Sequence, residues 1–465
     1  MRRIIPLILS LFFILTAQCA PMMYRDYWEI PPEISDYGVW DIAVDGPGNV
    51  YIIGTRGDNQ TDEANYVVIK YDSSGEELWS RMYNGPAGSK DFVTAIALDG
   101  PGNVYVTGCS MGALHEYVRN KLAPTYDYAT VKYDKDGNQL WVARYDAFGE
   151  DYAVDMAIDH AGNVYVTGVS DDSSRVGPDY VTIKYDTNGD ELWVARYEEG
   201  EPSAIAVDDY GNAYVTGNTH NNAFATIKYD KDGNQLWVVG PIEGNDIAVD
   251  EAGNAYVTGS SLGLKQSYKL VTIKYSMEGN ELWKAIYQGL AVWRPEQIVL
   301  DARKNIYITG TSHSSDINSN YLTIKYNDIG QEEWVAKYGG VCGSKDEANA
   351  MAVDIEGNVY VTGAEIHGLR MARFFNWWEK VHTWGDFVTV KYDASGEKQW
   401  TARVSGKGSG YTSGKAIAVD DIGNVYVTGN GRRYVDWRTV GDGPISWFTT
   451  IKYNANGEQQ WLARY

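Results

Sequence analysis

One sequence pattern recurs from Ile42 to the last residue, in two halves that are separated by a gap of variable length. The first half reads close to AIAVDxxGNVYVTG and the second close to DYxTIKYDxxGxxxWxARY. Self-similarity at a period of tens of residues is the signature of a repeat architecture, in which each copy is one structural unit. Eight copies are counted on the aspartate of the first half, at Asp45, Asp99, Asp159, Asp208, Asp250, Asp301, Asp354 and Asp420. The tryptophan of the second half gives the same number, at Trp79, Trp141, Trp193, Trp237, Trp283, Trp334, Trp400 and Trp461.

Within each copy the local signals are strands and tight turns. Alternating β-branched and aromatic residues, as in 164–167 and 181–185, have the period of two that places successive side chains on opposite faces of a sheet. Asp-x-x-Gly segments join these runs, and in such turns Asp accepts backbone N–H bonds while Gly adopts a positive φ. Each copy is therefore predicted to contain four strands, of the types AIAVD, NVYVTG, YVTIKYD and LWVARY.

Eight tandem units of four antiparallel strands, with bulky side chains on both sheet faces, are what a β-propeller requires. We therefore expect an all-β fold, a single eight-bladed β-propeller of four-stranded antiparallel blades over residues 38–465, after a lead-in at 20–37. An open β-solenoid is the alternative, although solenoid repeats are usually much shorter. A length of 465 residues would by itself favour about three domains. In this interpretation a single propeller domain accounts for nearly all of it.

The repeated residues resemble a known family. The pattern is similar to the bacterial SBBP β-propeller repeat, and the similarity runs from about residue 38 to 465. More distantly, AVDxxGNVYV resembles NHL repeats, and KYDxxGxxxW resembles the tryptophan-docking motif of eight-bladed quinoprotein dehydrogenases. The SBBP resemblance implies a secreted or cell-surface protein and little about chemistry. The quinoprotein resemblance lacks a vicinal Cys-Cys pair and a matching calcium and quinone site, so no cofactor is expected.

The first 19 residues have the layout of an export signal. Arg2 and Arg3 precede an apolar run from Ile4 to Leu15, and small or polar residues lead on to Cys19. The run is too short to span a bilayer with ease. Residues 15–19 also resemble a bacterial lipobox, in which Cys19 would be lipidated, and Gln18 departs from the small residue expected there. Lipid anchoring in the cell envelope and plain secretion both stay open, and either places the mature protein outside the cytoplasm.

The composition excludes one class of partner. The chain carries 62 acidic and 40 basic side chains, a formal net charge of −22. Binding a polyanion depends on clustered Lys and Arg, so nucleic acid is not expected as a partner, and membrane contact is expected only through the possible lipid anchor. The 16 Trp and 36 Tyr beside 9 Phe are too many for a disordered chain.

A residue that recurs once in every copy is expected to be architectural, because a catalytic residue is needed once or twice per protein. On this reasoning the eight Trp pack between blades, and the repeated Tyr and Asp fill sheet faces and bind turn amides. The repeated Lys, for example Lys184, lies inside a strand and must find an acceptor for its ammonium group. We expect it to reach a carboxylate or a turn carbonyl.

No metal site is expected. Asp134-Lys135-Asp136-Gly137-Asn138 faintly resembles a calcium loop but lacks the further oxygen ligands and the bidentate Glu of a true one. The six histidines show no metal-ligand spacing; they are His115, His160, His220, His313, His367 and His382. Cys109 and Cys342 fall nearly opposite each other on an eight-bladed ring, which favours two free thiols over a disulfide.

The candidate binding face follows from topology. In an antiparallel blade the first and third turns lie at one end, and the second connection and the link to the next blade lie at the other, variable end. Loops held by a rigid scaffold commonly carry function. The longest second connections are 109–127, 364–385 and 430–447, in copies 2, 7 and 8. Arg and aromatic side chains dominate interfaces and also stack on sugars. The predicted binding residues are Arg370, Arg373, Phe374, Phe375, Trp377, Trp378, Trp384, Arg432, Arg433, Tyr434, Trp437, Arg438 and Trp447.

Three classes of function remain. The preferred one is a non-catalytic envelope or secreted propeller that binds a protein or glycan through the variable end. The alternatives are an enzyme in the central channel, of the quinoprotein or NHL-lyase type, and a purely structural surface module, in which the long loops bury their aromatics against each other. The sequence identifies no catalytic residue, and propellers host many unrelated functions.

Overall fold

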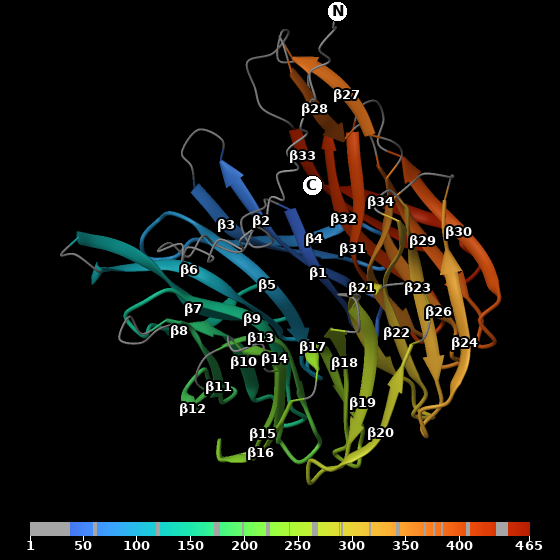
Figure 1. Ribbon diagram of the computed structural model, residues 1–465. Coiled ribbons are helices and arrows are strands. Elements are labelled where there is room, and N and C mark those ends of the chain that lie inside the picture. Colours follow the sequence, from blue (N-terminus) through green and yellow to red (C-terminus); the bar gives the residue numbers. More distant parts are fainter. Residues whose placement is uncertain are drawn as a thin grey trace, which may run out of the picture. The chain divides into compact units, whose positions relative to one another are not determined.

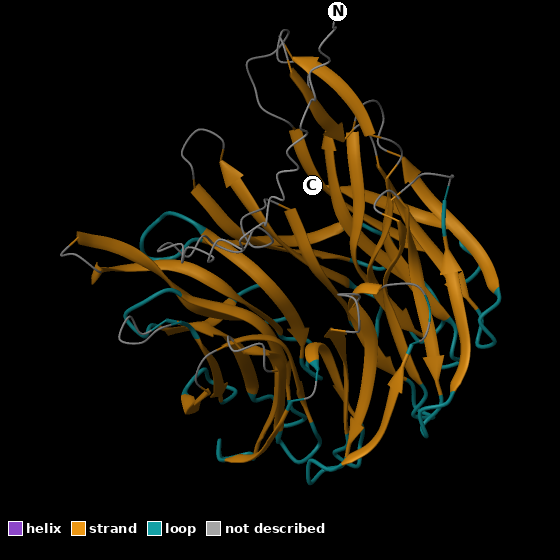
Figure 2. Ribbon diagram, viewed as in Figure 1, coloured by secondary structure: helices purple, strands orange, loops and turns teal. Residues whose placement is uncertain are grey.

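The computed structural model describes residues 38–465 apart from short internal segments, which are 59–62, 118–120, 172–176, 198–199, 220–223, 241, 263–267, 288, 290–291, 316–317, 341–344, 367–368, 375–376, 383–384, 406–409 and 434–444. The described part consists of strands and loops, without a helix (Figure 2). The expected signal at 1–19, the lead-in at 20–37 and Cys19 lie outside it.

The four strands of each sequence copy form one unit, labelled as in Figure 1. Unit 1 holds β1 (Gly38–Val44), β2 (Val50–Asp58), β3 (Glu63–Tyr71) and β4 (Glu77–Tyr83). Unit 2 holds β5 (Asp91–Leu98), β6 (Val104–Tyr117), β7 (Lys121–Tyr133) and β8 (Gln139–Tyr145). Unit 3 holds β9 (Asp151–Ile158), β10 (Val164–Ser170), β11 (Asp179–Tyr185) and β12 (Glu191–Tyr197). Unit 4 holds β13 (Gly200–Val207), β14 (Ala213–Thr219), β15 (Phe224–Tyr229) and β16 (Gln235–Val239).

Units 5 to 8 repeat this order. Unit 5 holds β17 (Glu243–Val249), β18 (Ala255–Leu262), β19 (Tyr268–Tyr275) and β20 (Glu281–Ile286). Unit 6 holds β21 (Val292–Leu300), β22 (Ile306–Ser315), β23 (Asn318–Tyr326) and β24 (Glu332–Tyr338). Unit 7 holds β25 (Lys345–Val353), β26 (Val359–Ile366), β29 (Gly385–Tyr392) and β30 (Lys398–Ser405), with the hairpin β27 (Leu369–Phe374) and β28 (Trp377–His382) inserted between β26 and β29. Unit 8 holds β31 (Gly410–Val419), β32 (Val425–Arg433), β33 (Ile445–Tyr453) and β34 (Gln459–Arg464).

Strand pairing within a unit is sequential and antiparallel. In unit 3, for example, Val166 lies opposite Met156 on one side and Ile183 on the other. Units 1 to 5 are separate four-stranded sheets, whereas units 6, 7 and 8 are joined by two isolated parallel pairs, Ser319 with Lys345 and Gly385 with Tyr411. The all-β class and the four-stranded antiparallel sheets predicted from the sequence are therefore confirmed.

The turns follow the predicted chemistry of Asp and Gly. Asp159 Oδ1 accepts the N–H groups of Ala161 (3.0 Å) and Asn163 (2.9 Å), and its carbonyl oxygen accepts the N–H of Gly162 (2.9 Å). Gly162 has a φ of +83°, which a side chain would make costly. The first and third turns of a unit are therefore short and closed by their own Asp.

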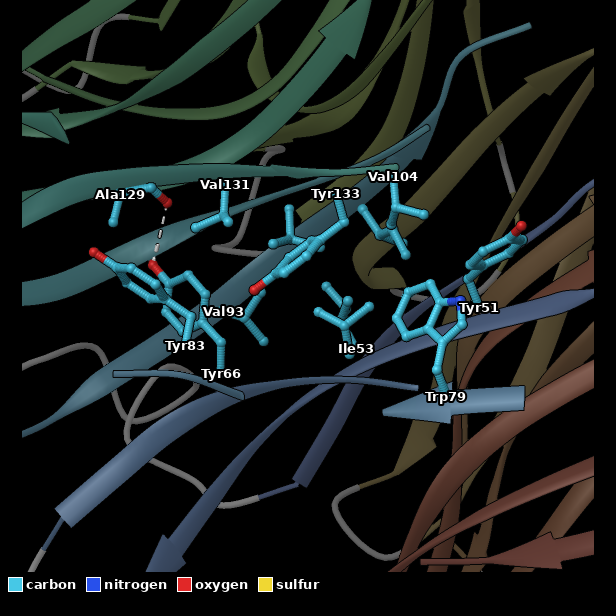
Figure 3. Close-up of a cluster of buried hydrophobic side chains, with 13 residues drawn as sticks. Tyr51, Ile53, Tyr66, Trp79, Tyr83, Val93, Val104, Ala129, Val131 and Tyr133 are labelled. Atoms are coloured by element: carbon cyan, nitrogen blue, oxygen red, sulfur yellow. Dashed lines mark hydrogen bonds between the residues drawn. The ribbon is translucent and has the colours of Figure 1, made fainter. Parts of the chain in front are cut away.

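The core lies between neighbouring units. Figure 3 shows the cluster between units 1 and 2, in which the Trp79 indole and the Tyr51 and Tyr66 rings of unit 1 pack with Val93 and Tyr133 of unit 2. The Tyr66 hydroxyl also donates to the carbonyl oxygen of Ala129 across the interface (3.3 Å). Equivalent clusters join the following units, so each sheet is buried on both faces, as the bulky residues in all four strands predicted.

A shared backbone carbonyl links each unit to the next. Lys184 Nζ (3.1 Å) and Trp193 Nε1 (3.0 Å) of unit 3 both donate to the carbonyl oxygen of Lys231, in the third turn of unit 4. Lys184 Nζ also lies 4.7 Å from the centre of the Tyr165 ring and 4.0 Å from Asp159 Oδ2. The indole acceptors from unit 1 onward are the carbonyl oxygens of Lys135, Thr187, Lys231, Met277, Asp328, Ala394, Ala455 and Ser73.

The expectation for the repeated lysine is confirmed in both of its forms. Seven of the eight described ammonium groups bond the same carbonyl oxygen as their indole partner, at 2.9–3.4 Å. In unit 5, Lys274 instead contacts the carboxylate of Asp328 in the third turn of unit 6.

A glycine in each third turn makes room for the indole. A Cβ placed on Gly189 would lie 2.7 Å from Trp141 Cδ2, closer than real Cβ atoms approach, and Gly189 has a φ of +88°. Glycine is thus required at this position for two reasons, the left-handed backbone and the close approach of the indole ring. The Asp-x-x-Gly signal in the sequence therefore encodes the docking between units as well as the turn.

The last unit makes the same contact with the first. Lys452 Nζ and Trp461 Nε1 of unit 8 both donate to the carbonyl oxygen of Ser73 in unit 1, each at 3.1 Å. A further bond runs from the Val39 N–H to Asn430 Oδ1 (2.6 Å). Apolar residues of both units share one cluster, which includes Val39, Ile52, Tyr426 and Phe448.

Replacing Lys184 with Met should lower the free energy of unfolding by about 1–3 kcal/mol, the usual contribution of a buried hydrogen bond from a charged group. The loss is measured by urea denaturation. Lys135→Met is the matched control, because the Lys135 side chain is 65% exposed and pairs with Asp136 only. Equal stability of the two variants would contradict the structural role of the repeated lysine.

Candidate functional site

The hairpin β27–β28 carries much of the predicted binding face. It starts three residues after β26 ends and stops three residues before β29 begins, at the end of unit 7 remote from its short turns. Its register pairs the backbone of Arg370 with Val381, Arg373 with Trp378 and Phe374 with Trp377. The predicted insertion at 364–385 is therefore an ordered ladder over most of its length.

The structure covers the other predicted residues unevenly. Arg432 and Arg433 lie in β32, where their backbones pair with Ser446 and Ile445 of β33, and Trp447 lies opposite Gly431. Phe375, Trp384, Tyr434, Trp437 and Arg438 lie outside the described residues. Backbone pairing thus brings the two ends of the 430–447 insertion together.

At this end of units 8 and 1, the described side chains include aromatic rings that lie next to arginine guanidinium groups. The Arg464 guanidinium lies 6.0 Å from the centre of the half-buried Trp447 ring. Tyr465 stacks on Phe448 (5.9 Å between ring centres, 28° between planes). The Arg56 guanidinium lies 5.3 Å from the Tyr465 ring centre and donates to its hydroxyl (3.2 Å). These contacts hold aromatic and cationic side chains together at the end where the long connections lie.

Sequence reasoning missed Arg56, Arg464 and Tyr465. Arg464 and Tyr465 belong to the repeated WxARY segment and were assigned to architecture, while Arg56 follows the first NVYVTG-like strand without any repeat signal. The position of Arg464 and Tyr465 in the last unit, next to the long insertion of that unit, is the signal that would have found these two residues, whereas no sequence signal points to Arg56 in unit 1.

The third predicted loop, at 109–127, is an extension of two strands. β6 and β7 run on as a long hairpin whose register reaches Tyr117 opposite Lys121. Cys109, at its base, is free and fully buried, and burial raises the pKa of its thiol well above the usual range. A buried thiol of this kind is inert rather than reactive. Cys342 lies outside the described residues.

A second group of polar residues lies along the first strands, which contact one another from unit to unit. Asp246 of unit 5 accepts the N–H of its neighbour Ile247 (2.8 Å) and, through its other oxygen, the N–H of Ile298 in unit 6 (2.8 Å). Asp41 and Asp155 bridge unit 1 to unit 2 and unit 3 to unit 4 in the same way. Gln297 provides a neutral version, accepting from Met351 of unit 7 (2.6 Å).

Burial makes these three carboxylates weaker acids. Burial raises the pKa of Asp41 and Asp246 to about 7 and that of Asp155 to about 6, although the N–H bonds to each carboxylate lower it. The charge of Asp155 further raises the pKa of Asp41 and Asp246. Carboxylic acids with pKa values in this range can act as catalytic acids or bases. In Asp41, Asp155 and Asp246, however, both carboxylate oxygens already accept hydrogen bonds from backbone N–H groups. The sequence signal was Asp before the repeated Ile or Met in copies 1, 3 and 5.

The turns that resemble calcium loops are occupied by their own hydrogen bonds. Asp134 Oδ1 accepts the N–H groups of Asp136 (2.9 Å) and Asn138 (2.8 Å), and Oδ2 accepts the Asn138 amide (2.8 Å). No group of three or more His, Cys, Asp and Glu in the described residues is arranged to hold a metal ion. His160 contacts Asp209 at 2.8 Å on the surface. The same part of the chain has no helix that is long and apolar enough to cross a membrane.

Stability should fall as the pH rises from about 4 to 7. The three carboxylates have folded-state pKa values above the value near 4 of an unfolded Asp, so the folded chain binds their protons more tightly and loses that advantage as the pH passes 6 to 7. Urea denaturation across this range measures the slope. Asp246→Asn should make it shallower, whereas Glu251→Gln, at an exposed turn of the same unit, should leave it unchanged. A slope unaffected by Asp246→Asn would refute this assignment.

Comparison with known proteins identifies the repeat. The family described as SBBP, beta-propeller repeat, matches residues 201–225, 238–264, 333–364 and 399–431. A regulatory protein FlaEY from Caulobacter vibrioides is 26% identical over 187 residues, which cover 36% of this chain and 19% of that protein, so the chain matches only about a fifth of this curated relative.

Solved structures with a similar course of the chain share little sequence with it. A eukaryotic initiation factor is 8% identical with a TM-score of 0.43, covering 93% of this chain and 96% of its own. The β-propeller domain of the trilobed protease from Pyrococcus furiosus is 9% identical with a TM-score of 0.41, covering 92% and 98%. The Pan2 WD40 domain of Neurospora crassa is 11% identical with a TM-score of 0.40, covering 71% and 88%.

The four matched segments fall on units 4 to 8, and the remaining units carry the same strands, turns and docking contacts. The chain is a β-propeller repeat protein, and four of its segments match the SBBP repeat.

Proposed function

We propose that the eight units close into a single eight-bladed ring, and that this ring is a non-catalytic scaffold which presents its variable end to a protein or glycan partner. The binding surface is formed by the connections of units 7 and 8 together with Arg56, Arg464 and Tyr465, and the long hairpin of unit 2 stands at the same end. The export signal expected at 1–19 places this partner in the cell envelope or outside the cell.

Ring closure is supported by the equivalence of the contacts. Unit 8 donates its Lys452 and Trp461 hydrogen bonds to a turn carbonyl oxygen of unit 1 at 3.1 Å each, within the range that the earlier units other than unit 5 use for their successors. The Trp461 ring also lies 6.2 Å from the Tyr71 ring, as Trp193 lies 6.2 Å from Tyr229. A chain end left open would expose this surface, whereas closure covers it, leaving Lys452 half-buried where the other seven repeated lysines are buried.

The binding surface is supported by its chemistry. The two insertions at 364–385 and 430–447 contain six Lys and Arg against four Asp and Glu, in a chain whose formal net charge is −22. The two insertions thus carry a formal net charge of +2, which favours a neutral or acidic partner. Arginine and tryptophan are also the residues that most often dominate binding energy.

The observation that carries the proposal is the paired arrangement of Arg464 with Trp447 and of Arg56 with Tyr465. Both pairs lie beside the insertions and hold their cations in place before a partner arrives, which lowers the entropy cost of binding. The three carboxylates of the first strands do not favour catalysis over this role, because each is occupied in joining two units.

Ring closure predicts that Gly75→Ala is as destabilising as Gly137→Ala. A Cβ at Gly75 would lie 2.6 Å from Trp461 of unit 8, and one at Gly137 would lie 2.8 Å from Trp79 of unit 1. Overpacking of this kind costs about 1–3 kcal/mol. Gly102→Ala isolates the backbone cost, since Gly102 has the same left-handed φ of +89° and its nearest contact is 3.8 Å away. If Gly75→Ala costs no more than Gly102→Ala, the ring is open.

Binding is tested by removing the unit 7 hairpin. Residues 367–384 are replaced by a short Gly-Ser turn, which keeps the last β26–β29 pair, Ile366 with Gly385. The wild type is first tested for capture of envelope proteins and for binding to a glycan array. Binding of whichever partner it retains should fall to background in the hairpin variant. Shortening the unit 2 hairpin between His115 and Ala123, which are paired in its ladder, is the matched control. Unchanged capture by a correctly folded hairpin variant would reject the proposed surface.

A further inference from the structure

A cavity of about 180 Å³ opens between units 7 and 8 at the end with the short turns, remote from the proposed binding surface. Three acidic residues from the first turns of the two units, Asp354, Glu356 and Asp421, contribute to its lining. Ile355 and Ile422 also line it and are the most exposed of the large apolar side chains described, at 77% and 80%. The cavity therefore combines an anionic wall with an apolar rim.

Two small residues, Gly423 and Ala455, line the cavity at positions that carry Lys304 and Asp328 at the interface of units 5 and 6. In unit 8 the second residue of the third turn is Ala455, where unit 6 has Asp328. Gly423 stands where unit 6 has Lys304, and a Cβ on Gly423 would lie 3.9 Å from the Tyr360 hydroxyl, compared with 3.1 Å for Gly211 and the Tyr165 hydroxyl at the interface of units 3 and 4. The crevice between units 7 and 8 is thus the wider of the two.

The interface of units 5 and 6 shows what fills the same crevice. There Lys304, with a φ of +62°, places its ammonium group 3.8 Å from Asp250 Oδ2, the equivalent of Asp354 in unit 5. Against the raising effect of burial, hydrogen bonds from Asn254 lower the pKa of Asp250, and the hydrogen bond from Lys274 lowers that of Asp328; the Lys304 charge adds a smaller lowering at both. The protein itself therefore places an alkylammonium group beside this repeated aspartate when the neighbouring turn supplies one.

The charges around the cavity between units 7 and 8 fit the same group. Its one lysine, Lys391, is already engaged by the Ala455 carbonyl oxygen (3.2 Å) and lies 5.0 Å from the Tyr360 ring centre. Asp354 is used by the turn, accepting from Tyr360 and Asn358. Glu356, which also accepts from Asn358 Nδ2 (3.3 Å), and Asp421 are exposed. Three carboxylates face one occupied ammonium group, so the lining has an excess of negative charge.

We propose that this cavity binds the side chain of a lysine from a partner polypeptide. The ammonium group lies beside Asp354, Glu356 and Asp421, and the four-carbon stem passes between Ile355 and Ile422, which accounts for two isoleucines that are otherwise exposed to water. Lys304 provides the internal precedent for the ammonium position. The site is independent of ring closure and of the partner proposed for the variable end.

The test uses the whole folded chain and a blocked amino acid, Nα-acetyl-lysine N-methylamide, with binding followed by the methyl NMR signals of Ile355 and Ile422. Blocked norleucine has a similar apolar stem without the charge. It should bind at least about threefold more weakly than the lysine probe, because that is the size of effect expected from losing one or two exposed ion pairs. High salt should weaken the lysine probe and leave norleucine unaffected. Equal binding of the two probes would overturn the proposal.

Two reciprocal variants locate the site. Gly423→Lys copies unit 6 and should abolish binding of the probe, because the chain then fills its own cavity. Lys304→Gly should open a second site beside Asp250 and add a binding event that is absent in the wild type. The double change Glu356→Gln with Asp421→Asn should weaken binding of the probe by about three- to tenfold. Unlike Gly423→Lys, it places no side chain at a position with a left-handed backbone, so it carries less risk of misfolding. Unchanged affinity in this double variant, or no second site in Lys304→Gly, would contradict the assignment.

Discussion

The structure depends on one interaction, the backbone carbonyl oxygen that accepts an indole N–H and, in seven of the eight described interfaces, a lysine ammonium group from the preceding unit. A carbonyl oxygen has two lone pairs and can satisfy both donors at once. The indole fills the space above a glycine, and the lysine stem lies over a tyrosine ring, so a buried positive charge is tolerated because it is bonded and stacked. Each of these interfaces therefore has an indole bonded to a turn carbonyl oxygen inside an apolar cluster.

This arrangement explains the composition. Each unit uses one Trp and two Tyr in its contacts with its neighbours, which accounts for 8 of the 16 Trp and 16 of the 36 Tyr. It also separates the two ends of the molecule. The short turns are needed for docking, since their glycines and carbonyl oxygens receive the neighbouring indole. The connections at the other end do not receive the indole and are free to lengthen, as in the hairpins of units 2 and 7.

The sequence was sufficient for what every unit repeats. The strands, the Asp-x-x-Gly turns and the carbonyl contact of the repeated lysine all followed from residues such as Asp159, Gly189 and Lys184, because eight occurrences separate a structural requirement from chance. Features present in only some units were missed. Asp41, Asp155 and Asp246 were hidden at a position that is Ala or Gln in the other copies. For each of them, one of the two backbone N–H donors lies in the next unit, which no local pattern reveals.

The candidate surface was predicted only in outline. Its location followed from topology and from the Arg and Trp content of two insertions, but the contribution of Arg56 depends on the last unit lying against the first, some 400 residues away in the chain. Arg464 and Tyr465 illustrate the opposite difficulty, because residues in a repeated position acquire a second role where a neighbouring loop is long. The cavity beside Gly423 depends likewise on how one interface differs from its equivalents.

The central claim is that all eight interfaces, including the one between the last and first units, have the same docked indole. The most direct measurement is hydrogen exchange of the tryptophan indole N–H groups followed by NMR, with the repeated tryptophans assigned by substitution. The account predicts that the Trp461 indole, bonded to the Ser73 carbonyl oxygen, exchanges as slowly as those of Trp141 and Trp193. Exchange of Trp461 at the rate of a free indole, with the others protected, would contradict it.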